Sequence, residues 1–210
     1  MTFAAIIPAL NEEKTIRIVL QILNQEKGLR EIIVVDDGST DATARESHMP
    51  GVRLIRNQKN IGKGAAMRIG ALASTADILI FFDADLVGMT PTHIRQLMDP
   101  FGKKNDLGMV VGLRDRYNGI TYVLRKISPI FMLSGERAMK RNLFLTVSQT
   151  STDFGIEVMM NTYCAKYHIP VEYVYLKGLD QVIKEIKYGF FHGFFARIRM
   201  IGQVIRAFIS

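Results

Sequence analysis

The sequence predicts an α/β fold, a mainly parallel sheet flanked by helices, and three observations support this fold class. Short apolar runs rich in β-favouring residues alternate with segments of helical apolar spacing along residues 1–115. Several of these runs end in acidic or glycine-rich turns. Strands that alternate with helices pair in parallel through right-handed crossovers. The strand ends are therefore expected at one edge of the sheet, where open α/β folds bind their ligands.

Hydrophobic periodicity places strands and helices in alternation along the first half of the chain. The expected strands are the apolar runs at residues 3–8, 31–37, 52–56 and 78–85. Asn11 is expected to begin a helix whose apolar residues are Ile16, Val19, Leu20 and Leu23. Glu12 and Glu13 would lie in its first turn, where acids suit the helix dipole. A further helix is expected after the glycine-rich turn at 60–64, with apolar residues Ala65, Ala66, Ile69 and Leu72.

The second half of the chain alternates less regularly. The expected helices are residues 91 to about 98, 120–133 and 154–166, and the expected strands are 108–113 and 171–176. We interpret residues 134–139 (SGERAM) as a polar turn into a short segment. The pattern predicts one domain over residues 1–183. A C-terminal tail at 184–210 is expected to form an amphipathic helix in which aromatic and basic residues are interleaved.

The composition is that of a folded protein with an anionic partner. Of 210 residues, 48% are hydrophobic and 22% are charged, which argues against extensive disorder. The single cysteine, Cys164, excludes an internal disulfide and fits a reducing compartment. The first residues lack the pattern of a signal peptide, so we expect a cytoplasmic location. A formal charge of +7 favours nucleic acid, a phosphorylated substrate or a membrane surface as partner.

Two carboxylates, Asp83 and Asp85, follow the apolar strand that begins at Ile78. Parallel topology is expected to bring them to the same sheet edge as the turns at 36–41 and 60–64. A nucleotide bound there needs acceptors for its ribose and base, and a divalent cation for its diphosphate. Mg²⁺ and Mn²⁺ prefer oxygen ligands. We therefore expect Asp85 to hold Mg²⁺ or Mn²⁺, and Asp83 to face the ribose or a metal-bound water.

Four motifs follow one another along the chain: residues 8–13 (PALNEE), 34–41 (VVDDGSTD), 60–64 (NIGKG) and 83–85 (DAD). In this order and spacing they resemble the motifs of family 2 glycosyltransferases with the GT-A fold. The resemblance implies a Rossmann-like GT-A domain that transfers a sugar with inversion from a nucleotide-diphosphate donor. It also implies that the residues binding the nucleotide-sugar are Pro8, Ala9, Asn11, Glu12, Asp36, Asp37, Lys63, Asp83 and Ala84. In this comparison Asp85 is the catalytic metal ligand.

Within that family, residues 112–114 (GLR) resemble an element of the dolichyl-phosphate mannose synthases and related polyprenyl-phosphate glycosyltransferases. The resemblance implies that Arg114 and Arg125 clamp the phosphate of a lipid acceptor, a task that suits guanidinium geometry. A phosphate acceptor is already ionised and needs no general base. That branch often has a glutamine, as an additional metal ligand, where this chain has Val87. Candidates to complete the metal shell are Asp83, Asp180, Gln181 and His192.

A second branch, the glucosyl-3-phosphoglycerate synthases, is resembled by residues 134–139 and 154–158 (FGIEV). That resemblance implies that Glu157 lies near the acceptor and acts as the base for a soluble hydroxyl acceptor. Glu157 is otherwise a helix residue whose charge suits a helix N-terminus. Glu136 with Arg137 is either a pair in the acceptor site or an ion pair that stabilises the turn.

The tail favours a membrane surface over nucleic acid as the anionic partner, because aromatic residues accompany its cations. Arginines interrupt every window of the ~20 apolar residues that a span requires. The sequence thus predicts a peripheral enzyme at the inner membrane face that glycosylates a polyprenyl phosphate from a UDP-, GDP- or dTDP-sugar. A soluble hydroxyl acceptor, a non-catalytic nucleotide-sugar-binding subunit and a nucleotidyltransferase are the alternatives. A homo-oligomer is compatible with this prediction.

Overall fold

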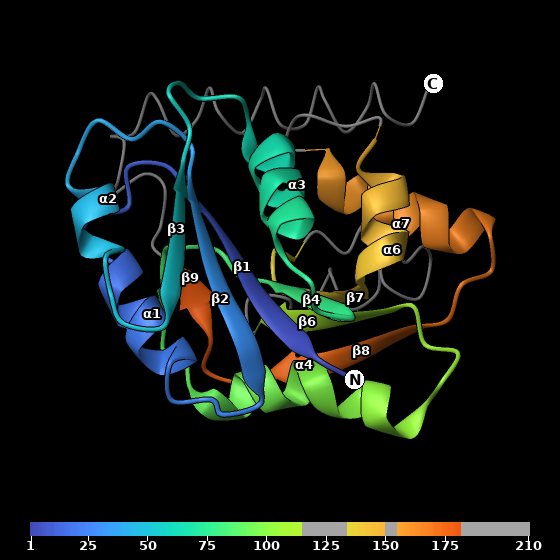
Figure 1. Ribbon diagram of the computed structural model, residues 1–210. Helices are drawn as coiled ribbons and strands as arrows, with labels where there is room; N and C mark the ends of the chain where they lie inside the picture. Colours follow the sequence, from blue (N-terminus) through green and yellow to red (C-terminus); the bar gives the residue numbers. More distant parts are fainter. Residues whose placement is uncertain (115–133, 150–154, 182–210) are drawn as a thin grey trace.

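The structure, a computed structural model, describes residues 1–114, 134–149 and 155–181. These residues form a seven-stranded sheet with helices on both faces and a separate two-stranded sheet (Figure 1). The α/β prediction is confirmed. The predicted helix at 120–133, the tail at 184–210, Arg125 and His192 lie outside the described residues. No helix in the described part of the chain has the length and apolar character needed to cross a membrane.

The large sheet is mainly parallel, with one antiparallel strand inside it. Its strands in spatial order are β3 (Val52–Arg56), β2 (Leu29–Asp36), β1 (Phe3–Ala9), β4 (Ile78–Phe81), β7 (Arg137–Lys140), β6 (Met109–Arg114) and β8 (Val171–Leu176). β7 pairs antiparallel with both β4 and β6, and the other neighbours are parallel. The prediction of a polar turn at 134–139 therefore missed β7. Four residues with a basic residue at each end give too short an apolar pattern to be recognised as a strand.

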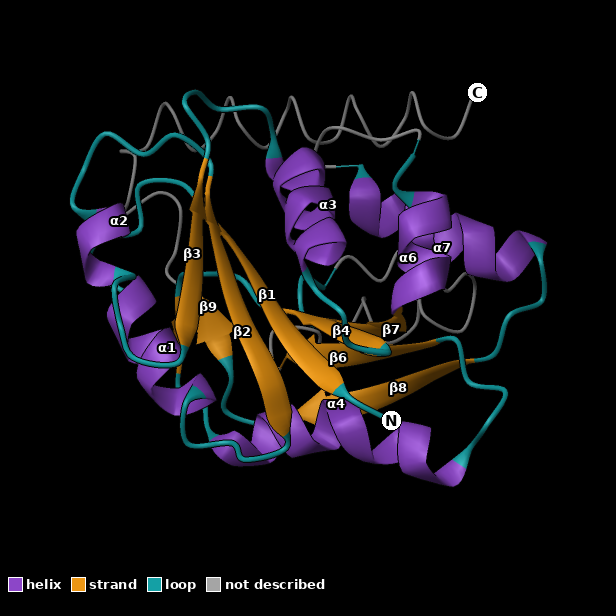
Figure 2. Ribbon diagram, in the orientation of Figure 1, coloured by secondary structure: helices purple, strands orange, loops and turns teal. Residues whose placement is uncertain are grey.

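The helices cover the two faces of the sheet and bury two hydrophobic clusters. They are α1 (Ile16–Leu23), α2 (Thr43–Glu46), α3 (Lys63–Ala73), α4 (Pro91–Lys103), α6 (Arg141–Val147) and α7 (Ile156–Lys166). The helices α1 and α4 pack on one face, and α3, α6 and α7 pack on the other (Figure 2). Successive residues of β1 enter different clusters, which explains why this strand is almost uniformly apolar.

The helix α1 begins later than the sequence predicted. The predicted core residues from Ile16 to Leu23 are buried as expected, but Asn11 adopts φ 56°, outside the helical region. The backbone N–H groups of Thr15 and Ile16 donate to the carbonyl of Glu12. The acids therefore belong to a loop ahead of the helix, and the helix-dipole argument for them was wrong.

The helix α3 differs from the prediction at Leu72, which is 56% exposed and does not belong to the core. The predicted Ile69 is half-buried and packs against the core. A Cβ atom added at Gly70 would lie 2.5 Å from the side chain of Ile6 in β1. The close approach of the helix to the sheet therefore requires glycine at this position. The helix α4 is also longer than predicted and ends at Lys103.

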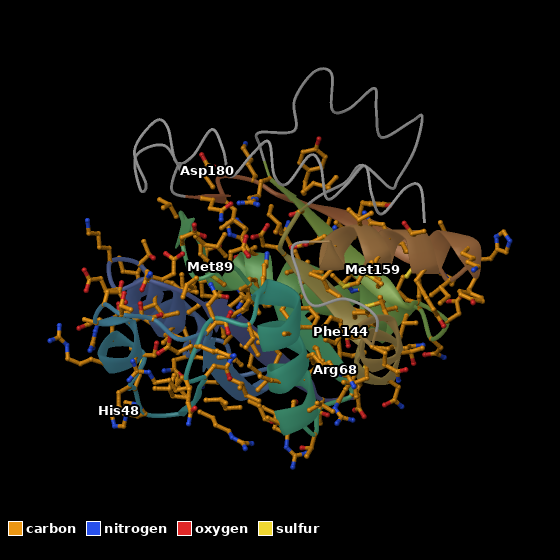
Figure 3. The ribbon with its side chains drawn as sticks, turned by 90° about the horizontal axis from the view of Figure 1, so that it is seen from above. His48, Arg68, Met89, Phe144, Met159 and Asp180 are labelled. Atoms are coloured by element: carbon orange, nitrogen blue, oxygen red, sulfur yellow. The ribbon has the colours of Figure 1, made fainter. Side chains whose placement is uncertain are left out.

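The contact between α3 and α6 fixes the second layer of the fold. Arg68 donates to the carbonyl of Leu145 at 3.0 Å and to the hydroxyl of Ser148 at 3.1 Å. Phe144 stacks on Phe81 of β4 with ring centroids 4.4 Å apart. Figure 3 labels Arg68 and Phe144. Phe144 is fully buried, so β4 is held directly against the helix layer.

We predict that Phe144→Ala lowers the free energy of unfolding by about 3–5 kcal/mol, the range found when a buried aromatic ring is replaced by alanine. The exposed Leu72→Ala in the adjoining helix is the control and should change it by less than about 0.5 kcal/mol. Urea denaturation followed by circular dichroism measures both. Equal effects of the two substitutions would contradict the packing described above.

Candidate active site

The functional residues gather where β1, β2, β4 and β6 end. β6 runs parallel to β4 because β7 is antiparallel to both. The loop that precedes β7 therefore reaches the same edge and brings Glu136 beside Arg114. A Cβ atom added at Gly135 would lie 2.5 Å from an oxygen of Asp83, so glycine leaves room for this carboxylate. The sheet edge expected from the sequence is thus also formed by the start of an antiparallel strand.

Lys63 joins two of the predicted site residues. Its Nζ atom lies 2.8 Å from Asp83 Oδ1 and 2.7 Å from Glu157 Oε1. Burial favours the neutral amine, but the carboxylates of Asp83 and Glu157 outweigh it and raise the pKa of Lys63 above its ordinary value. Lys63 therefore remains protonated at neutral pH. Glu157, near the N-terminus of α7, faces the same cluster as Asp83.

Asp85 contacts a second group of side chains through Gln181. The Gln181 Nε2 atom donates to Asp85 Oδ1 at 2.7 Å, and Gln181 Oε1 accepts from Arg114 Nη1 at 2.9 Å. Arg114 Nε lies 3.1 Å from Glu136 Oε2, which also accepts from the Ser134 hydroxyl at 2.8 Å. Burial raises the pKa of the Glu136 carboxyl, while the Arg114 guanidinium opposes the rise. Asp85, Arg114 and Glu136 are all buried.

The small sheet explains how Gln181 reaches Asp85. β9 (Asp180–Gln181) pairs antiparallel with β5 (Leu86–Val87), so Gln181 lies opposite Leu86 and Asp180 lies opposite Val87. Val87 is 51% exposed. Position 87 therefore provides no polar group beside Asp85. Gln181 of β9, almost a hundred residues later, provides one instead. Asp180, labelled in Figure 3, accepts from the backbone N–H of Gln181 at 2.8 Å.

Asp36 and Asp37 organise the neighbouring loops. Asp37 accepts from Asn57 Nδ2 at 2.8 Å and from the backbone N–H groups of Ile61 and Gly62, at 3.1 and 2.9 Å. Asp36 accepts from the Ser39 N–H at 2.9 Å, and its other oxygen lies 3.1 Å from a nitrogen of the Arg56 side chain. Their carboxylates therefore fix the turn ahead of Lys63 and the turn after β2.

The loop after β1 is tied to the loop after β2. The N–H of Asn11 donates to Ser39 Oγ at 2.9 Å, and its side-chain oxygen accepts from the Thr40 N–H at 3.0 Å. The N–H of Glu12 donates to Thr43 Oγ1 at 2.7 Å. The remaining predicted residues near this edge are the half-buried Pro8 and the buried Ala9 and Ala84.

The residues at this edge fit Mg²⁺ or Mn²⁺. Asp83, Asp85 and Gln181 present oxygen-bearing side chains together, the ligand type that these ions prefer. Within the described ranges, no group of three or more His, Cys, Asp or Glu side chains is arranged to hold a metal. A small number of protein ligands is typical of metal sites where substrate phosphates complete the coordination shell. The Gln181 Oε1 atom accepts from Arg114, and the Nε2 atom faces Asp85. Gln181 can therefore bind the metal only if its side-chain amide rotates and exchanges these two atoms.

Comparison with known proteins assigns the chain to a family. Residues 4–165 match the family described as glycosyl transferase family 2. The chain belongs to this family. The chain is 30% identical over 124 residues to the glucosyl-3-phosphoglycerate synthase of Mycolicibacterium smegmatis, covering 55% of this chain and 41% of that protein. The dolichyl-phosphate beta-glucosyltransferase of Dictyostelium discoideum is 28% identical over 183 residues, covering 78% and 49% of the two chains.

A solved structure from this family has the same fold. Glucosyl-3-phosphoglycerate synthase from Mycobacterium tuberculosis, in complex with Mn²⁺, UDP and glucosyl-3-phosphoglycerate, superposes with a TM-score of 0.72 and 26% identity. The match covers 86% of this chain and 71% of that one. The GT-A prediction is therefore confirmed. The chain spans less than half the length of the two curated relatives compared above.

The family 2 motifs predicted the members of this site better than their partners. Glu136 pairs with Arg114 instead of the neighbouring Arg137, which donates to the Ser134 carbonyl at 2.7 Å and to Asn161. Both interpretations of the Glu136–Arg137 pair were therefore wrong. Successive residues at the start of a strand point to opposite faces, and this alternation was the available signal.

We predict that Asp37→Ala lowers the free energy of unfolding by about 2–4 kcal/mol, because three part-buried donor groups lose their acceptor. A fully buried loss costs about 1–3 kcal/mol, and access of water to these donors reduces the cost of each. The exposed Asp99→Ala in α4 is the control, with an expected change below about 0.5 kcal/mol. Chemical denaturation compares the two variants. Unchanged stability of Asp37→Ala would show that water replaces its bonds to the turn at 60–62.

Proposed function

We propose that this family 2 protein is an inverting, divalent-metal-dependent glycosyltransferase with a nucleotide-diphosphate sugar donor and a hydroxyl acceptor. The observation that carries this proposal is the Lys63 ammonium, which links Asp83 on the donor side to Glu157. The sequence alone favoured a lipid-phosphate acceptor, for which no base is needed. The Glu157 carboxylate contacts the same Lys63 ammonium as Asp83, which supports a hydroxyl acceptor with Glu157 as its base.

Asp83 and Asp85 have the position and chemistry to bind the donor with its metal. The glucosyl-3-phosphoglycerate synthase from Mycobacterium tuberculosis has been seen with Mn²⁺ and UDP-glucose and with Mg²⁺ and UDP, which supports the same donor chemistry here. When bound, Mg²⁺ or Mn²⁺ neutralises the diphosphate and stabilises the negative charge that develops on it as it leaves. Asp85 holds the ion, and Asp83 and Lys63 orient the donor at the strand ends.

Glu157 acts as the base in this proposal. Its carboxylate is ion-paired with Lys63 and only 8% exposed. It accepts the proton of the acceptor hydroxyl while that oxygen forms a bond to the anomeric carbon. The bond from the anomeric carbon to the diphosphate breaks, and the nucleoside diphosphate leaves with the electron pair. Attack from the face opposite the leaving group inverts the configuration.

The first test is sugar transfer from radiolabelled UDP-, GDP- and dTDP-sugars with Mn²⁺. The acceptors are a three-carbon phosphorylated acid and a polyprenyl phosphate, and the product is partitioned between water and organic solvent. We expect a water-soluble product, and no detectable transfer by Asp85→Ala, whose circular dichroism should match that of the wild type. Wild-type activity of Asp85→Ala would remove the metal assignment. No transfer from any donor would favour a non-catalytic nucleotide-sugar-binding subunit.

The second test separates the two acceptor classes through Glu157→Gln. The amide keeps the shape but cannot accept the hydroxyl proton, so kcat should fall by about 10²–10⁴-fold. The KM for the donor should change little. Glu172→Gln is the matched control, because Glu172 is also ion-paired with a lysine but lies in β8 on the surface. Nearly full kcat in Glu157→Gln would point to an acceptor that is already ionised.

A lipid-phosphate acceptor is the second candidate, favoured by the similarity to the dolichyl-phosphate beta-glucosyltransferase over 78% of this chain. In this alternative Arg114 and Arg125 bind the acceptor phosphate, and the tail at 184–210 attaches the enzyme to the inner membrane face. A product that enters the organic phase, together with activity that survives Glu157→Gln, would favour this candidate over the first.

A further inference from the structure

The site contains a buried arginine close to the carboxylates that are proposed to bind metal. Arg114 reaches Asp85 through a single residue, because Gln181 contacts Arg114 with its oxygen and Asp85 with its nitrogen. The same nitrogen lies 3.4 Å from Asp83 Oδ2. An arginine that moved by the length of this amide would pair directly with Asp83 and Asp85. These two acids can bind a divalent cation only if another group keeps Arg114 away from them.

Glu136 is built to hold Arg114. Its side chain is completely buried, and the Ser134 hydroxyl donates to the same oxygen that contacts Arg114 Nε. Its backbone is fixed as well, since the N–H of Gly112 in β6 donates to the Glu136 carbonyl at 2.9 Å. Both members of the ion pair therefore lie at strand ends, Arg114 at the end of β6 and Glu136 directly before β7. Such outer partners orient the groups that bind a metal.

We propose that Glu136 is a positioning residue: it keeps Arg114 off Asp83 and Asp85, so that a divalent cation can bind these two carboxylates. This inference rests on the metal site of the proposed function. Among the described residues, these contacts join the two cations Lys63 and Arg114 to four carboxylates. The carboxylates are those of Asp83, Asp85, Glu136 and Glu157, and the formal charge of the cluster is −2 when all six groups are ionised. That charge complements a divalent ion.

Removing the Glu136 charge has two consequences, and both weaken cation binding. The cluster loses one negative charge, which reduces its attraction for the ion. The buried Arg114 loses a carboxylate partner, and a buried charge is stable only when it is paired. Arg114 and the carboxylates of Asp83 and Asp85 contact the same Gln181 amide, so Arg114 then competes with the metal for the oxygens of these two acids.

The test measures Mn²⁺ binding by electron paramagnetic resonance of the free ion, with the full chain and without any donor. Glu136→Gln should raise the Kd for Mn²⁺ about 10–100-fold, the usual effect of losing such an outer partner. The surface variant Glu172→Gln should leave the Kd unchanged. Thermal unfolding without metal checks that each variant is folded.

A double variant separates positioning from a general structural effect. Glu136→Gln with Arg114→Gln removes the competing cation together with its partner. It should restore the Kd to within about threefold of the wild-type value, because the formal charge of the cluster returns to −2 and no guanidinium competes for Asp83 and Asp85.

Wild-type Mn²⁺ affinity in Glu136→Gln would overturn the inference and leave the proposed function standing. A loss that is not restored by Arg114→Gln would also overturn it. If the wild-type chain binds no Mn²⁺, either alone or with UDP, GDP or dTDP present, the proposed function and this inference both fail.

Discussion

The antiparallel insertion of β7 between β4 and β6 is the constraint on which the site depends. It keeps β6 parallel to β4, so that Arg114 ends at the same edge as the strand leading to Asp83. It also makes the start of β7 coincide with the ends of its neighbours, which places Glu136 beside Arg114. A wholly parallel sheet would have put the start of this strand, and Glu136 with it, at the opposite edge.

The acids near the strand ends serve different purposes, and their partners distinguish them. Asp36 and Asp37 accept from backbone N–H groups of adjoining turns, so their role is to hold loops in place. Asp83, Asp85 and Glu157 contact lysine and amide side chains that meet at the strand ends. The second group is the one to which the proposed function assigns the metal and the acceptor.

The relatives and the geometry bear on different parts of the proposed reaction. Membership of glycosyl transferase family 2 and the fold of a UDP- and Mn²⁺-bound relative support the proposed donor at the strand ends. The names of the relatives differ in the acceptor, since one is named for phosphoglycerate and another for dolichyl phosphate. In this chain the choice depends on the ion pair of Glu157 with Lys63, which joins two helices of the same sheet face.

The sequence by itself determined the fold class, the family and most members of the site, because strand periodicity and the four motifs are local patterns. It also predicted the core face of α1. Only the tertiary structure showed that β7 is a strand and that Glu136 pairs with Arg114. It also showed that Lys63 lies between Asp83 and Glu157. Gln181 contacts Asp85 and takes the place of a polar residue at position 87. These contacts join residues up to 96 positions apart. Ion pairs and amide contacts depend on where strands end in space, which spacing along the chain does not specify.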